Sequence, residues 1–131
     1  MPFRFEWRDQ SKRAICYIAE GHWNWKDYHQ AVRASAFTLM SAPQHVDSVI
    51  DLRGSARRDL PAGASAHLRS FGRKTQARLS GRAAVIGLPD VEVEDLRAGA
   101  LVTADGLVKF VESEAGLEEL LAEWAANPPE S

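Results

Sequence analysis

One segment, residues 46–68, constrains the fold of this chain more than any other. It starts as a continuously apolar run, continues through a polar loop rich in arginine, and reaches Pro61. Proline suits the first turn of a helix because it has no N–H group to satisfy. A buried strand that leads into a helix is the repeating unit of α/β domains, which place ligands and partners at the end of the strand. The segment therefore predicts an α/β fold and a candidate functional corner.

The rest of the chain alternates strand and helix patterns around this segment. Residues 3–8 alternate aromatic and charged side chains, as a half-buried strand does, and residues 13–20 are more continuously apolar, as a central strand is. Asn24 can cap the helix that follows. The expected order is β-β-α-β-α-β-α-β-α, over residues 3–8, 13–20, 24–39, 46–52, 61–71, 82–87, 90–104, 107–112 and 117–124.

This order predicts a single domain over residues 1–126. Alternating strands and helices after an initial strand pair form a mixed, mostly parallel sheet, here five-stranded and covered by about four helices. The tail, residues 127–131, is expected to fray.

Residues 90–104 have two interpretations. Leu96, Ala100 and Leu101 can line a short helix, which is the interpretation we favour. Alternatively, residues 101–103 and 107–109 flank an Asp105-Gly106 turn and form a hairpin.

Composition narrows the function classes. The 131 residues contain no apolar run that approaches the ~20 residues needed to span a bilayer. The N-terminal residues do not resemble a signal peptide. Cys16 is the only cysteine, so it excludes an internal disulfide, and its place in an apolar strand predicts an inert thiol. We therefore expect a cytoplasmic protein. The four histidines have no metal-ligand spacing, and no cofactor or metal is expected.

The charges are distributed unevenly along the chain. Residues 53–82 carry eight basic and one acidic side chain, whereas residues 90–131 carry eleven acidic and two basic ones. The basic segment can attract an anionic partner, or it can be a solvated helix face. A nucleic-acid partner is not expected, because no aromatic side chains that could stack on nucleobases are interleaved with the basic residues. The opposed segments make a homodimer a possible assembly.

Three stretches of the chain carry a family resemblance. They are residues 21–28, residues 49–52 with the following loop and Gly63, and residues 108–113 before an acidic amphipathic helix. In this order they resemble the first-helix start, the central strand with its switch helix, and the final strand and helix of the STAS superfamily, the anti-sigma-factor-antagonist fold with its SpoIIAA-like branch. The resemblance implies a non-catalytic, regulatory protein-interaction module with an unknown protein partner.

The resemblance also implies a switch that this chain lacks. In STAS domains an Asp-Ser pair stands at the N-terminus of the second helix, and a kinase phosphorylates the serine. A gap-free count from the Asp-Leu of the strand places this pair on Asp59 and Leu60, and leucine cannot accept a phosphoryl group. Ser55 lies earlier, and Ser65 would take the position only with a loop of different length. We expect no phosphoacceptor.

The first candidate site is a loop that accepts an anion or an acidic partner at the start of the second helix. Helix N-termini favour anions, and arginine binds carboxylates and phosphates through two parallel hydrogen bonds. The candidate residues are Arg53, Ser55, Arg57, Arg58 and Asp59. Alternatively, Asp51 and Asp59 pair with these arginines and order the loop. Because no positioned nucleophile or base accompanies these two carboxylates, we expect no enzyme activity there.

The second candidate site is an aromatic group formed by Trp23, Trp25 and Tyr28. It is either core, where the first helix leaves the sheet, or an exposed surface for a partner or an apolar ligand. SpoIIAA-like relatives resemble lipid-transfer-type domains in fold. The alternative function is therefore small-ligand or lipid binding, through an apolar pocket or the arginine-rich loop.

Overall fold

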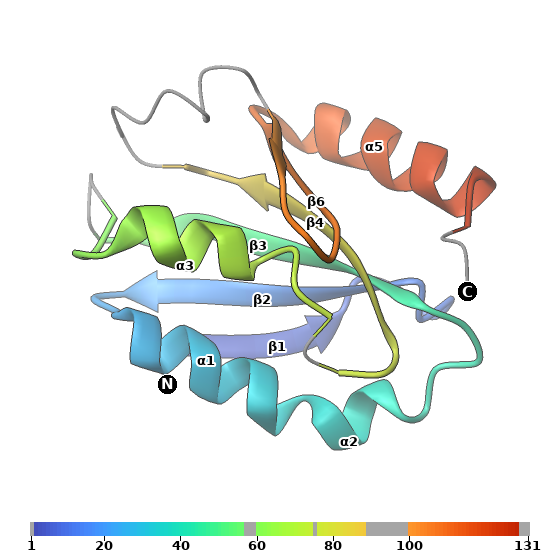
Figure 1. The fold of residues 1–131 in the computed structure, drawn as a ribbon, viewed down its shortest axis with the longest axis horizontal. Coiled ribbons are helices and arrows are strands. Elements are labelled where there is room, and N and C mark those ends of the chain that lie inside the picture. The colour runs from blue at the N-terminus through green and yellow to red at the C-terminus, as the bar shows by residue number, and fades with distance from the viewer. Residues whose placement is uncertain (1, 57–59, 75, 89–99, 129–131) are drawn as a thin grey trace.

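The computed structural model describes residues 2–56, 60–74, 76–88 and 100–128, which form one mixed sheet with helices on both faces (Figure 1). The strand order is β1-β2-β3-β4-β6-β5. The strands are β1 (Phe3–Trp7), β2 (Ala14–Gly21), β3 (Val46–Ser55), β4 (Leu79–Ile86), β5 (Ala100–Val102) and β6 (Leu107–Val111). The inner strands β2, β3, β4 and β6 run parallel, and β1 and β5 pair antiparallel at the two edges. The predicted α/β class is confirmed, although the described residues form six strands where five were predicted.

Four helices are present in the described part of the chain. They are α1 (Trp25–Ala34), α2 (Ala36–Leu39), α3 (Ala64–Ser70) and α5 (Glu114–Ala126). The helices α1, α2 and α3 cover one face of the sheet, and α5 covers the other (Figure 1). Asn24 caps α1 as predicted, since its side chain accepts from the N–H of Asp27 while the Asp27 carboxylate accepts from the N–H of Asn24. None of these described helices is long and apolar enough to cross a membrane.

Side chains of β3 point alternately to the two faces of the sheet. Ile50 and Leu52 belong to the apolar core under α1, α2 and α3, whereas Val49 belongs to the smaller core under α5. Because the side-chain period of a strand is two, Asp51 and Arg53 share the α5 face with Val49. This alternation decides which predicted site residues can meet.

The preferred interpretation of residues 90–104 as a helix is wrong for residues 100–102, which form β5. Leu101 pairs with Val108 in an antiparallel hairpin, and the N–H of Thr103 donates to the carbonyl of Gly106 at 2.9 Å. The Asp105-Gly106 turn was the alternative interpretation. Any Cβ at Gly106 would overlap the carbonyl oxygen of Gly81, so the turn packs tightly against the start of β4. Residues 89–99 lie outside the described residues.

The helix after β3 begins later than predicted. A helix was expected from Pro61, but α3 starts at Ala64 and follows Gly63, whose φ of 85° lies in the left-handed region that favours glycine. Ala62 and Gly63 form a turn before it, and the indole Nε1 of Trp25 donates to the carbonyls of Pro61 and Ala62. At the other end of the chain, Asn127 closes α5, and residues 129–131 of the predicted tail lie outside the described residues.

Candidate functional site

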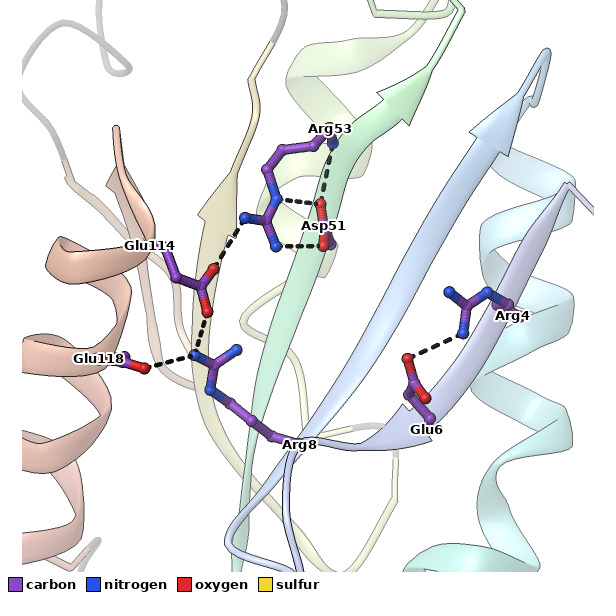
Figure 2. Close-up of polar contacts among 7 residues, drawn as sticks. All are labelled: Arg4, Glu6, Arg8, Asp51, Arg53, Glu114 and Glu118. Atoms are coloured by element: carbon purple, nitrogen blue, oxygen red, sulfur yellow. Dashed lines mark hydrogen bonds and ion pairs between the residues drawn. The ribbon is translucent and has the colours of Figure 1, made fainter.

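A chain of ion pairs occupies the end of β3, where the sequence predicted an anion-accepting loop (Figure 2). Arg53 donates to Asp51 through Nε at 3.1 Å and Nη2 at 2.8 Å, and to Glu114 through Nη1 at 2.9 Å. Arg8 donates to the other oxygen of Glu114 at 2.6 Å, with Glu118 at 3.8 Å. Since Glu114 is the first residue of α5, the cluster ties β3 and the end of β1 to that helix.

The charges of this cluster compensate each other. Although burial acts to raise the pKa of Asp51, the hydrogen bonds from Arg53 hold it below its ordinary value. The hydrogen bond from Arg8 lowers the pKa of Glu114. Arg53 therefore pairs with two carboxylates of the chain itself, those of Asp51 and Glu114. These contacts order the end of β3. For this arginine the structure supports the alternative interpretation, in which Asp51 is its partner.

The predicted site does not form around Arg53 because its parts lie on opposite faces of the sheet. Arg53 reaches the start of α5, whereas α3 packs on the other side. Ser55 also has an internal partner, since its Oγ accepts from the indole Nε1 of Trp23 at 2.8 Å. The remaining three predicted loop residues, 57–59, lie outside the described residues.

Leu60, at the position of the family's phosphoacceptor serine, anchors the segment before α3. Its side chain is buried, and it belongs to the same core as Leu68 and Phe71 on the inner side of this segment. Pro61 beside it is buried as well. An apolar anchor therefore stands where the family has its switch.

The aromatic group Trp23, Trp25 and Tyr28 is core, so the interpretation as an exposed surface is wrong. Their exposed fractions are 3%, 6% and 5%. The rings of Trp23 and Trp25 meet edge to face at 5.1 Å, and Trp25 stacks on His67 at 4.8 Å. Trp25 lies under the segment before α3, to which its indole N–H donates, and Trp23 and Tyr28 pack edge to face on Phe3 of β1.

His29 and His67 lie side by side, an arrangement that the sequence did not predict. The Nε2 atom of His29 and the Nδ1 atom of His67 are 3.0 Å apart, so this contact links α1 to α3. Burial lowers the pKa of His29, and the nearby positive charges of His67, Arg33 and Arg73 add to the effect. The two histidines are 38 residues apart, and no pattern along the chain pairs them.

We predict that the burial of His29 beside His67 makes the free energy of unfolding depend on pH. Because the pKa of His29 is lowered on folding, the unfolded chain binds more protons between the two pKa values, and the free energy of unfolding decreases as the pH falls through that window. Urea unfolding between about pH 7 and about pH 5, around the ordinary histidine pKa, should show a smaller decrease for His29→Gln than for the wild type. His22→Gln, at an exposed histidine, is the control. Equal decreases in the wild type and His29→Gln would contradict the prediction.

In the part of the chain that the structure describes, no group of three or more His, Cys, Asp or Glu side chains is placed to hold a metal ion. Cys16 is buried in β2, and this burial raises the pKa of its thiol. A raised pKa disfavours the reactive thiolate, as expected for an inert cysteine.

A groove lies between α3 and the hairpin of β5 and β6. Its volume is about 230 Å³, and its lining includes Arg69, Arg73, Val102 and Asp105. The side chain of Val102 is 74% exposed, which is unusual for a large apolar residue of a strand. The sequence did not predict this groove because the residues of β5 were expected to belong to a helix.

No protein-family model, curated protein or solved structure matches this chain. The resemblance to STAS domains therefore rests on the three sequence stretches and the order of the elements.

Proposed function

We propose that this chain is a non-catalytic, STAS-like protein-interaction module with a regulatory role, which binds an acidic partner protein through the groove between α3 and the β5–β6 hairpin. The observation that carries the proposal is the combination of arginine side chains and the exposed Val102 in that groove. Protein interfaces combine an apolar contact with surrounding polar and charged groups in this way.

The order of the elements supports the proposal. The parallel strands β2, β3 and β4 are neighbours in sequence order, and the connections between them contain α1 with α2, and α3. The resemblance implies that the strand containing Asp51 and Leu52 is followed by the switch helix. In the structure this strand is β3, and the next element is α3. The proposed surface is thus next to the segment through which STAS domains are regulated.

The charge of the surface selects the chemistry of the partner. The lining of the groove includes two arginines, Arg69 and Arg73, and one acidic side chain, Asp105. Leu68 and Phe71 are buried, which leaves Arg69, Arg73 and Lys74 on the outer side of this segment. A partner that offers carboxylates around an apolar side chain complements this surface, and its encounter rate should fall with added salt.

Affinity capture with matched variants tests the proposal. The wild-type chain is used to capture proteins from a lysate of its source cells, and each captured protein is purified and titrated directly. We expect at least tenfold weaker binding by the double variant Arg73→Glu/Lys74→Glu, which corresponds to about 1.4 kcal/mol. The control Lys26→Glu/Arg33→Glu makes the same charge change at exposed positions of α1 and should bind within about twofold of the wild type. Equal affinity of both double variants, or the absence of any direct binder, would contradict the proposal.

A second copy of the chain is one acidic partner that this test can identify. The outer side of α5 carries the exposed residues Glu118, Glu119 and Glu123. A dimer that forms at high concentration and is lost in Arg73→Glu/Lys74→Glu would identify the partner as a second copy. Light scattering of the purified chain over a concentration series measures this directly.

We place the module in the cytoplasm, where a single buried thiol needs no oxidising environment. The alternative function, binding of a lipid or another apolar ligand, loses its main support because Trp23, Trp25 and Tyr28 are buried.

A further inference from the structure

We infer that a second surface, a cleft beside the C-terminal end of α5, binds the carboxylate or phosphate group of a small molecule. The cleft has a volume of about 320 Å³, and its lining includes Arg13, His45, Arg78 and Arg82. It lies at the amino ends of β3 and β4, away from the ion pairs of Arg53 and from the groove at α3. The inference is independent of the proposed function because the two surfaces share no residue.

The backbone places two arginines on either side of the start of β3. The N–H of Asp47 donates to the carbonyl of Arg13 at 2.9 Å, and the N–H of Val46 donates to the carbonyl of Arg78 at 2.7 Å. Arg13 directly precedes β2, and Arg78 directly precedes β4, the two parallel neighbours of β3. The sheet thus brings together two basic residues that are 65 positions apart in the chain.

The floor of the cleft is a compensated ion pair. Arg82 donates to Asp47 through Nε at 2.9 Å, and the hydroxyl of Ser80 donates to the same carboxylate at 2.6 Å. Arg82 also donates to the carbonyls of Trp124 and Asn127, at 3.2 Å and 2.6 Å. The C-terminal end of a helix carries a partial negative charge, which repels anions. Because Arg82 binds the last carbonyls of α5, its positive charge offsets that partial charge beside the cleft.

The two outer arginines are left without a close anion in the described part of the chain. Arg13 and Arg78 are exposed residues, and among the described residues neither guanidinium group has a hydrogen-bond or ion-pair partner. Arg13 acts on Asp9 and Asp47 only through longer-range charge. Since Asp47 is already paired with Arg82, the cleft holds an excess of positive charge.

The shape and chemistry of the cleft favour a compact oxyanion. Guanidinium groups bind the planar edge of a carboxylate or two oxygens of a phosphate through paired hydrogen bonds. A volume of about 320 Å³ is at the lower end of the range for small-molecule pockets. Small dicarboxylates and phosphate monoesters share this chemistry, and the two arms of the experiment below separate them.

Titration of the isotope-labelled chain followed by NMR tests the inference, with inorganic phosphate in one arm and succinate in the other. At constant ionic strength, we expect saturable shifts of the backbone amides of residues 13, 45–47 and 78. The arm with the lower dissociation constant indicates which oxyanion is preferred. In Arg13→Gln/Arg78→Gln we expect at least tenfold weaker binding, whereas the control Lys26→Gln/Arg33→Gln should match the wild type.

Other outcomes would overturn the inference. They are shifts that do not saturate, shifts that chloride reproduces, or equal affinity in the two double variants. Folding of each variant is checked by its amide spectrum before titration. Arg73→Glu/Lys74→Glu should bind phosphate and succinate like the wild type, so a failure of the proposed function can be distinguished from a failure of this inference.

Discussion

Replacement of Trp25 by alanine is expected to lower the free energy of unfolding by about 3–5 kcal/mol, the usual cost of deleting a large buried aromatic side chain. Trp25 is the first residue of α1, and its ring contacts Trp23, His67 and Phe71. Its indole N–H also donates to the carbonyls of Pro61 and Ala62, at 3.1 Å and 3.0 Å. The substitution therefore leaves a cavity and removes the only donor that the described residues offer these two carbonyls.

Urea unfolding followed by far-ultraviolet circular dichroism measures this loss, and two further variants separate its causes. Trp25→Phe keeps a ring but removes the donor, so it should cost less than Trp25→Ala. Phe37→Ala removes an aromatic side chain that is 86% exposed on α2, and it should change stability by less than about 0.5 kcal/mol. A loss below about 1 kcal/mol for Trp25→Ala would contradict a core role for this residue.

The second large effect is expected at Asp47, whose replacement by alanine should lower the free energy of unfolding by about 2–3 kcal/mol. Both Asp47 and its partner Arg82 are largely buried, and removal of one member leaves the other charge without its partner. Complete burial of such a pair gives losses of about 3–5 kcal/mol. A smaller value is expected here because the carbonyls of Trp124 and Asn127 still accept from Arg82.

A double-mutant cycle separates the pair from the rest of the cluster. Because Asp47→Ala and Arg82→Ala remove the same contact, the double variant should lose less stability than the sum of the single variants. Glu119→Ala, at an exposed acidic residue of α5, is the control and should have little effect. Simple additivity of the two single variants would show that Asp47 and Arg82 do not stabilise each other across β3 and β4.

Much of the fold could be predicted because periodicity records which side chains are buried. The alternation of residues 3–8 and the apolar run of residues 46–52 correspond to β1 and the buried part of β3. The spacing of Leu117, Leu120 and Trp124 predicts the buried side of α5, and all three are buried. The hairpin of β5 was missed because its three residues form too short a pattern to distinguish from a helix.

The candidate site could not be predicted because it depends on which face of the sheet each residue occupies. Arg53 and the start of α3 are close in sequence. However, side chains of a strand alternate between the two faces of the sheet, so Arg53 lies on the face covered by α5, where it pairs with Glu114. The pairs His29–His67 and Arg13–Arg78 come together only through tertiary packing, and neither pair has a local pattern.

The most direct test of the proposed interaction surface is an NMR titration of the isotope-labelled chain with the purified, captured partner. We predict that the largest shifts of backbone amides lie in residues 64–74 and 102–105, along α3 and the β5–β6 hairpin. Shifts confined instead to the ion-pair cluster of Asp51, Arg53 and Glu114, or to the cleft beside α5, would contradict docking at α3.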